Sequence, residues 1–153
     1  MMNNDVLRSI RYMLDISDTK VVDIIKLGGI DVTKAQVMAF MKKDEEEGFE
    51  PCSDEVMAHF LDGLVFFKRG KDESRPPLPI EMPITNNIVL KKLRVAFELK
   101  EEDMHAILKA AEFPVSKPEL SALFRKAGHN NYRLCGDQLL RNFLRGLTLR
   151  VRG

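Results

Sequence analysis

The cysteines and histidines of a sequence are leading candidates for nucleophiles, general bases and metal ligands, and this sequence has five of them: Cys52, Cys135, His59, His105 and His129. A catalytic thiol needs a base beside it and a lowered pKa. A structural zinc site needs closely spaced pairs of cysteines or histidines. Neither pattern is present, and no Gly-rich phosphate loop is found. We therefore expect two buried structural thiols, no catalytic residues, no metal and no cofactor.

A second group of side chains could bind anions. Arg141, Arg145 and Arg152 fall within about 40° of one another on a helical wheel, opposite the apolar residues of the same segment. Three further cations precede this segment and complete the candidate contacts for an anion or a nucleic acid: Lys117, Arg125 and Lys126. Arg133 adds basic charge nearby. Such a surface suits phosphates or an acidic protein, although it equally fits a solubilising surface.

The scaffold that must position these residues is duplicated. Residues 3–70 and 86–153 align without a gap at an offset of 83 positions, and 19 of the 68 pairs are identical. Because a repeat compares the protein with itself, residues kept in both copies are expected to be scaffold. We refer to the two copies as repeat 1 and repeat 2.

Each repeat is predicted to contain four helices, because apolar residues recur at helical spacing and polar or glycine residues divide the segments. No stretch alternates apolar and polar residues long enough for a strand. The sequence therefore predicts an all-α fold of two homologous four-helix repeats that pack pseudo-symmetrically. The predicted helix N-caps are Asn4, Ser17 or Asp18, Thr33, Ser53, Asn87 and Ser116.

Two sets of paired residues make specific predictions. Gly63 and Gly146 stand inside strongly periodic helices, where glycine costs about 1 kcal/mol relative to alanine; we expect another helix backbone to approach there. Arg11 and Arg94 in the first helices, with Asp54 and Asp137 at the start of the last helices, predict an ion pair or a capping contact in each repeat. The apolar pattern also places Met38 and Val151 on inner faces.

Residues 71–85 form a linker with four prolines, which favour stiff, extended chain. At about 3.1 Å per residue it could reach about 40 Å. Leu78, Ile80, Met82 and Ile84 alternate with prolines and Glu81. We expect this strap to lie in a groove.

The net charge of +1 is unevenly distributed. Repeat 1 has 9 Lys/Arg against 13 Asp/Glu, the linker has 2 against 3, and repeat 2 has 13 against 7. One interpretation is that the acidic and basic halves attract each other, and the other is a basic face for an acidic partner. Helices two and three of repeat 2 also admit a helix-turn-helix, although the turn residues, 112–115, include no glycine.

Three duplicated motifs carry a resemblance to a known family. They are Asn-Asn-x-Val-Leu-x-x-x-Arg (3–11 and 86–94), Cys-x-Asp (52–54 and 135–137) and Phe-Leu-x-Gly-Leu-x-x-x-x-Arg-Gly (60–70 and 143–153). Together they resemble the YehS family of small bacterial proteins. The resemblance covers both repeats and implies a tandem-repeat cytoplasmic protein of unknown function. It implies no catalytic or binding residues.

The leading hypothesis is a non-enzymatic interaction module that binds a protein partner, and the alternative is nucleic-acid binding through the basic face of repeat 2. An enzyme with a site between the repeats remains a third hypothesis. No apolar run approaches the roughly 20 residues needed to span a bilayer, so no membrane partner is expected. The N-terminus lacks the order of a secretory signal, and a cytoplasmic location is expected.

Overall fold

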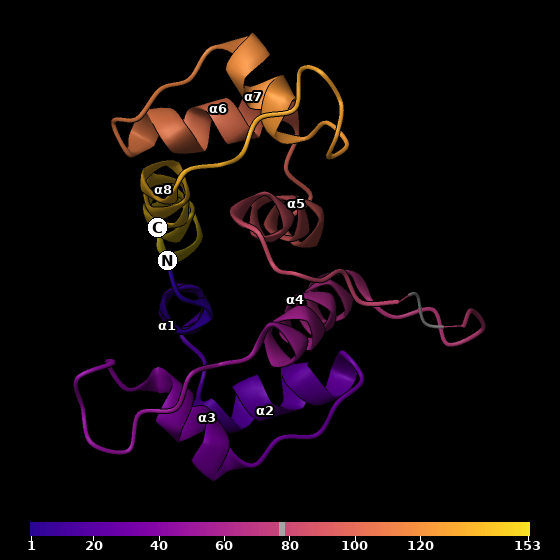
Figure 1. Cartoon of the computed structure of the whole chain (residues 1–153), viewed down its shortest axis with the longest axis vertical. Coiled ribbons are helices and arrows are strands. Elements are labelled where there is room, and N and C mark those ends of the chain that lie inside the picture. The colour runs from indigo at the N-terminus through magenta and orange to yellow at the C-terminus, as the bar shows by residue number, and fades with distance from the viewer. Residues whose placement is uncertain (77–78) are drawn as a thin grey trace. The chain divides into compact units, whose positions relative to one another are not determined.

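The computed structural model describes residues 1–76 and 79–153, and within them every regular element is a helix. The helices in chain order are α1 (Asn3–Leu14), α2 (Asp18–Leu27), α3 (Lys34–Met41), α4 (Asp54–Arg69), α5 (Asn86–Ala96), α6 (Glu101–Ala110), α7 (Lys117–Leu123) and α8 (Asp137–Arg152) (Figure 1). The prediction of an all-α fold with four helices in each repeat is confirmed. None of these helices is long and apolar enough to cross a membrane.

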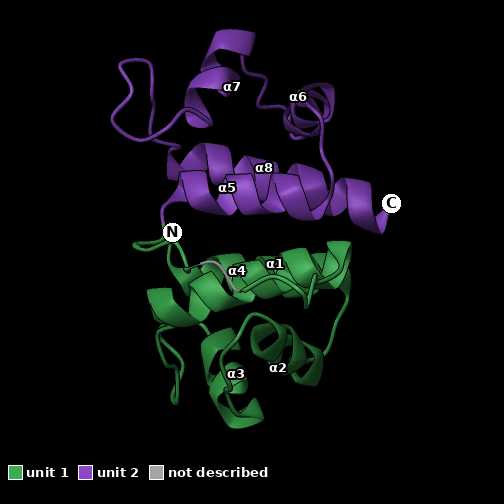
Figure 2. Ribbon diagram, turned by 90° about the vertical axis from the view of Figure 1, so that its right-hand side faces the viewer, with its two compact units in different colours: residues 1–84 green, residues 85–153 purple. Residues whose placement is uncertain are grey.

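The chain divides into two compact units, Met1–Ile84 and Thr85–Gly153, each with its own four helices (Figure 2). Most of the predicted strap therefore belongs with the first unit. Its end is tied there, because the backbone amide of Ile84 donates to Asp54 Oδ2 at 3.1 Å. Met82 is 53% exposed, while Leu78 lies outside the described residues. That the strap fills a groove stays a prediction.

Four predicted N-caps begin helices as expected. The hydroxyl oxygens of Ser17, Thr33, Ser53 and Ser116 each accept a hydrogen bond from the backbone amide three residues on. The predicted caps Asn4 and Asn87 are wrong. Their helices begin two residues earlier than predicted, with Met2 and Thr85 in the cap positions. The asparagines point inward instead and are buried.

Asn4 closes repeat 1 through three hydrogen bonds to main-chain atoms. Its amide nitrogen donates to the carbonyl oxygens of Phe40 and Glu50, at 3.0 and 2.9 Å. Its side-chain oxygen accepts from the backbone amide of Cys52 at 3.0 Å. One buried side chain therefore joins α1 to the end of α3 and to the segment that leads into α4, and it satisfies polar groups that burial would otherwise leave unpaired.

Asn87 makes the same three bonds in repeat 2. Its amide nitrogen donates to the carbonyls of Leu123 and Arg133, both at 2.9 Å, and its oxygen accepts from the amide of Cys135 at 2.8 Å. We call these two residues the asparagine clamps. In repeat 2 the clamp fixes both the end of α7 and the loop that follows it, residues 124–136.

The duplicated glycines lie where two helices cross. A Cβ added at Gly63 in α4 would stand 1.9 Å from the carbonyl oxygen of Ile24 in α2, and one at Gly146 in α8 would stand 2.2 Å from that of Ile107 in α6. Real Cβ atoms cannot occupy such positions. The predicted close approach of a second helix backbone is confirmed, and these glycines are packing residues.

The predicted ion pair between the first and last helices is wrong. Arg11 Nε lies 3.6 Å from Asp18 in α2, not beside Asp54. Arg94 donates from Nε to the carbonyl of Leu99. The carboxylates of Asp54 and Asp137 accept instead from the first asparagine of each repeat, Asn3 and Asn86, both at 2.8 Å.

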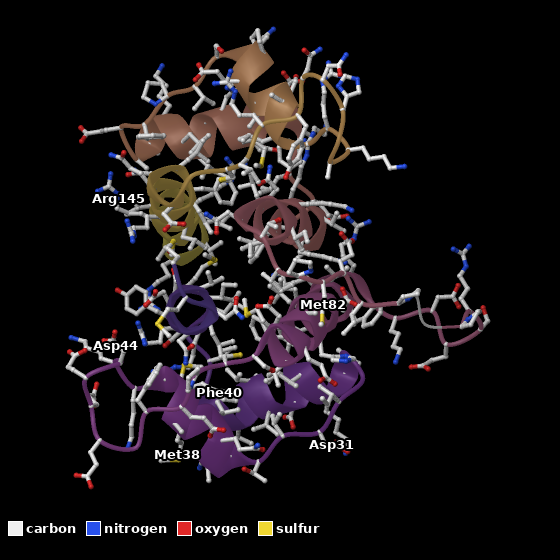
Figure 3. All side chains as sticks on the ribbon, in the orientation of Figure 1. Asp31, Met38, Phe40, Asp44, Met82 and Arg145 are labelled. Carbon is white, nitrogen blue, oxygen red and sulfur yellow. The ribbon has the colours of Figure 1, made fainter. Side chains whose placement is uncertain are left out.

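Two residues predicted to face inward are exposed. Met38 in α3 is 49% exposed and Val151 near the end of α8 is 38% exposed, whereas Phe40 is buried. Figure 3 shows Phe40 inside the first unit and Met38 on its outside. Val37 and Phe40, three residues apart, form the buried face of α3, and Met38 lies about 100° around the helix from Val37, so its side chain points away from that face.

Candidate functional site

The two thiols lie where they cannot act as nucleophiles near neutral pH. Burial raises the pKa of Cys52 to about 12, with the nearby carboxylates of Asp54 and Glu50 adding to the effect. Burial and the carboxylate of Asp137 raise the pKa of Cys135 to about 11. Both thiols are free and buried. Since the thiolate is the reactive form, these residues are structural.

The histidines make local contacts. His59 Nδ1 lies 2.8 Å from the carbonyl oxygen of Gly28, at the end of α2. His105 Nε2 lies 3.8 Å from Glu101, one turn earlier in α6. The ring nitrogen Nδ1 of His129 accepts from the backbone amide of Asn131 at 3.0 Å. Over residues 1–76 and 79–153, no three His, Cys, Asp or Glu side chains are grouped to hold a metal ion.

The predicted arginine stripe on α8 is exposed, but part of it holds the repeat together. Arg145 (Figure 3) donates to the carbonyl of Ala111 at the end of α6. The adjacent Arg150 pairs with Asp103 of α6 at 2.6 Å. Arg141 and Arg152 lie at the surface of the same helix. A role of Arg141, Arg145 and Arg152 in binding an anion stays a prediction.

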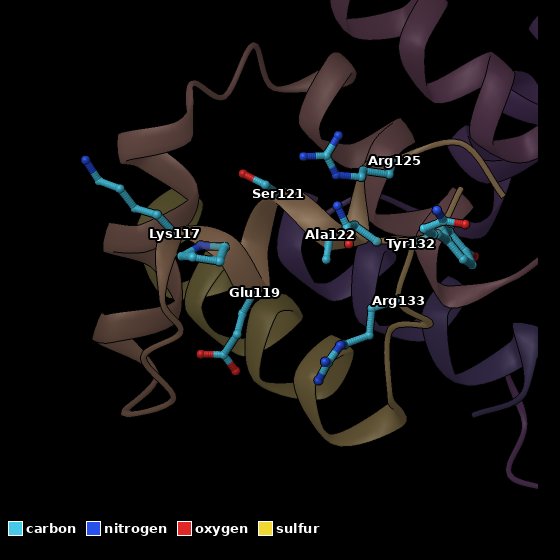
Figure 4. A pocket seen from close by; sticks show the side chains of 10 residues that line it. Lys117, Glu119, Ser121, Ala122, Arg125, Tyr132 and Arg133 are labelled. Atoms are coloured by element: carbon cyan, nitrogen blue, oxygen red, sulfur yellow. The ribbon is translucent and has the colours of Figure 1, made fainter. Parts of the chain in front are cut away.

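The predicted cations that precede α8 in the sequence lie on or near a hollow of about 700 Å³ beside α7 (Figure 4). One side of it is α7 and the residues just after, and the other is the loop before α8. We call it the basic hollow. It is lined by Lys117, Pro118, Glu119, Ser121, Ala122, Arg125, Asn130, Asn131, Tyr132 and Arg133. It brings together Lys117 and Arg125 with Arg133, while Lys126 is exposed nearby and does not line it.

Two of the three cations of the basic hollow are available to a ligand. Lys117 and Arg125 are exposed and make no hydrogen bond or ion pair with any described residue. The only carboxylate in the lining is Glu119, which caps α7: hydrogen bonds from the Ser116 backbone amide and then from the Ser116 side chain, with a smaller effect of Arg133, lower its pKa. Glu119 is thus ionised and occupied, and it offsets one of three positive charges.

A second, smaller hollow of about 390 Å³ continues from the first. It shares Ser121 and Arg125 and adds Arg94, Glu101, Leu120 and Phe124. The guanidinium of Arg94 lies 4.7 Å from the centre of the Phe124 ring, a cation–π contact. Arg94, predicted to form an ion pair, is therefore a fourth cation along the same surface, in addition to Lys117, Arg125 and Arg133.

The loop wall of the basic hollow was missed by the sequence analysis. Asn130, Asn131 and Tyr132 were not among the candidate contacts, because they carry no charge and form no motif. A signal was available in the repeat alignment. The acidic run 44–47 of repeat 1 corresponds to Ala127, Gly128, His129 and Asn130 in repeat 2, so this loop loses four carboxylates.

The same place in repeat 1 is occupied by its own side chain. Lys42, the counterpart of Arg125, turns across the loop, and its Nζ donates to the carbonyl of Glu47 at 2.8 Å. The counterparts of Asn130 and Arg133 are Glu47 and Glu50. The ten positions that carry a net charge of +2 in repeat 2 therefore carry no net charge in repeat 1.

These features define a class: an all-α protein of two homologous four-helix repeats, in which the second repeat carries an open basic hollow. The family described as "Protein of unknown function (DUF1456)" matches residues 3–70 and 86–153 separately. The chain belongs to this family.

A relative carries the name predicted from the duplicated motifs. The chain is 51% identical over 150 residues to "Uncharacterized protein YehS" of Escherichia coli (strain K12), which covers 98% of this chain and 96% of that protein. The predicted resemblance is confirmed. No solved structure matches this chain.

Proposed function

We propose that this protein is a non-enzymatic interaction module that binds an anionic macromolecule through the basic hollow of repeat 2. The observation that carries the proposal is the difference between two copies of one frame. The loop is positioned by the same asparagine clamp in both repeats, yet the ten positions of the hollow carry a net charge of +2 in repeat 2 and none in repeat 1, where Lys42 is bonded to Glu47. Duplicated scaffold with a divergent surface is the pattern expected when one copy acquires a binding role.

The chemistry of the rest of the chain supports binding over catalysis. The thiols are held protonated by burial, and each histidine ring nitrogen named above serves a local contact. Lys117, Arg125 and Arg133 are exposed, and exposed cations attract an anionic partner over about 10 Å at moderate ionic strength.

The test is retention of the full chain on immobilised heparin, used as a generic polyanion. We expect the wild type to bind and to elute with salt. The variant K117E/R125E/R133E should elute at much lower salt. The matched control is K34E/K42E/K43E, which makes the same change of charge in repeat 1, at the counterparts of Lys117, Arg125 and Lys126, and should elute near the wild type.

Two results would overturn the proposal. Passage of the wild type through the column at low salt means that the hollow does not bind polyanions. Equal loss of retention in both triple variants means that overall charge, and not the hollow, governs binding. Thermal unfolding of each variant, followed by circular dichroism, shows that the proteins compared are folded.

A further inference from the structure

The shape of the basic hollow distinguishes between kinds of nucleic acid. A helix that recognises duplex DNA must protrude from the surface of its domain to enter a major groove about 12 Å wide. The exposed face of α7 instead forms one wall of a concavity (Figure 4). The opposite wall is held against α7, because the backbone amide of Arg133 donates to the carbonyl of Ala122 at 3.1 Å. The predicted helix-turn-helix therefore lacks a free recognition helix.

A concave surface accepts a thin, flexible chain more readily than a duplex. Lys117 and Ser121 stand four residues apart in α7, and Arg125 follows just after the helix ends. All three line the same hollow, so two cations and a hydroxyl are brought to one surface. The surface continues past Arg125 into the second hollow, where Arg94 lies. Lys117, Arg125 and Arg94 thus form a cationic track that runs through both hollows, as the backbone of a single strand requires.

The loop wall offers different chemistry from this track. The side-chain amides of Asn130 and Asn131 can both donate and accept hydrogen bonds, as the edges of unpaired bases demand. Tyr132, half-buried, places an aromatic ring on the same wall. Base–aromatic stacking contributes about 1–3 kcal/mol per base. An acidic peptide would need further donors on this wall, and it would gain less from an amide pair and a ring.

We propose that the two hollows bind single-stranded nucleic acid, with phosphates on Lys117, Arg125 and Arg94 and a base stacked on Tyr132. This inference rests on the proposed function, since it names the anionic partner of the same site. It goes beyond that function in specifying an unpaired strand and in assigning the loop wall to base contacts.

The experiment is fluorescence anisotropy of the full chain with labelled oligothymidylate and oligouridylate, each compared with a duplex of the same length. We expect the single strands to bind at least tenfold more tightly than the duplex. Three phosphate contacts predict that the logarithm of the binding constant falls with the logarithm of salt concentration with a slope of about −2.

The variants separate the track from the loop wall. Exchange of Lys117 and Arg125 for Glu should weaken single-strand binding tenfold or more and make the salt slope shallower. Tyr132→Leu should weaken binding about tenfold at an unchanged salt slope, whereas Tyr132→Phe should bind as the wild type does. Lys34→Glu, which makes the same change of charge at the counterpart of Lys117 in repeat 1, should have little effect. If Tyr132→Leu proves unfolded, the salt slope and the preference over duplex still decide.

Four outcomes overturn this inference. If the duplex binds as tightly as the single strands, the concave surface does not select an unpaired strand. If Tyr132→Leu binds single strands as tightly as the wild type does, no base stacks on Tyr132. Absence of binding to either strand, while heparin retention remains sensitive to K117E/R125E/R133E, excludes nucleic acid and leaves the proposed function standing with an acidic protein as the partner. Loss of heparin retention in the wild type would remove both proposals.

Discussion

The contact between the second and fourth helices is made in both repeats, but with different side chains. In repeat 1 the ammonium of Lys20 in α2 lies 4.6 Å from the centre of the Phe67 ring in α4. At the equivalent positions of repeat 2, Asp103 in α6 pairs with Arg150 in α8. A cation–π contact in one copy thus stands where an ion pair stands in the other.

The carbonyl that follows each of these helices shows the same exchange. The Gly28 carbonyl contacts His59 in repeat 1, whereas the Ala111 carbonyl accepts from Arg145 in repeat 2. These donors come from non-equivalent positions of the last helix. The comparison teaches that residues unique to one copy are not thereby functional, since His59 and Arg145 both serve the end of a helix. The basic hollow differs from these cases because two of its cations, Lys117 and Arg125, make no hydrogen bond or ion pair with any described residue.

The largest effect is expected at the helix crossings, which test whether the two copies share one scaffold. Gly63→Ala and Gly146→Ala each force a Cβ into a neighbouring carbonyl, and we expect each to lower the free energy of unfolding by about 3 kcal/mol, at the upper end of overpacking costs. Urea denaturation measures this change. Gly136→Ala is the control, because nothing lies within 4 Å of its added Cβ. Equal stability of the three variants would contradict the packing role.

The asparagine clamps come next. Asn4→Ala and Asn87→Ala each remove three hydrogen bonds to buried or half-buried main-chain groups, so we expect a loss of about 2–3 kcal/mol. The loss should be greater at Asn4, which is 1% exposed, than at Asn87, which is 7% exposed. Chemical denaturation measures both. Asn3→Ala, at a less buried neighbour with two bonds, should cost less; a cost equal to that of Asn4→Ala would contradict the assignment.

Low pH should weaken the Asp103–Arg150 ion pair of repeat 2 but not the Lys20–Phe67 contact of repeat 1. The change in stability is small because the ion pair is exposed. The Lys100 amide and then Arg150 lower the pKa of Asp103. A lowered folded pKa stabilises the protein above the ordinary aspartate value of 3.8, and this stabilisation disappears as the pH falls through the folded value. The stability difference between the wild type and Asp103→Asn should therefore narrow in acid.

The matched control for this pH dependence is Phe67→Leu. It removes the corresponding contact of repeat 1 without changing a carboxylate, so its stability difference from the wild type should stay constant over the same pH range. Thermal unfolding at several pH values measures both. If the stability differences of Asp103→Asn and Phe67→Leu from the wild type change equally with pH, the ion pair of repeat 2 and the cation–π contact of repeat 1 do not differ in their dependence on a carboxylate.

The smallest effect concerns the start of the last helix. Ser53 caps α4, whereas Gly136 begins α8 without a side-chain cap. Gly136→Ser should add a few tenths of a kcal/mol to the free energy of unfolding, and Ser53→Gly should remove a similar amount. Denaturant titration resolves the pair when the two variants are measured together. Destabilisation by Gly136→Ser would mean that another group already satisfies the amides there.

The duplicated scaffold was predictable from the sequence because periodicity and glycine positions act locally. Gly63 within an apolar helix can only mean close packing or a ligand, and the repeat favoured packing. The role of Asn4 was not predictable, since its partners lie 36 to 48 residues away, and capping is the commoner use of asparagine near a helix start. The ion-pair prediction was wrong for a different reason: Arg11 lies beside Asp18, which is much closer in the sequence than the predicted partner Asp54.

The candidate site was half predictable. Charge alone identified Lys117 and Arg125, but a helical wheel cannot show that Arg145 donates to the carbonyl of Ala111 at the end of α6. Tyr132 and the two asparagines of the loop carry no charge, so only the folded loop reveals that they face the same hollow.

In each repeat the asparagine clamp forms hydrogen bonds only with main-chain atoms, at the two ends of the loop between the third and fourth helices. Whatever side chains the loop bears between those ends, the carbonyls and the amide that hold it are the same. Because these hydrogen bonds do not involve the side chains of the loop, mutations that change the charge or size of those side chains leave the bonds of the asparagine clamps in place. The family architecture should accordingly accept engineered loops at residues 43–49 and 126–132 as a route to new recognition specificities.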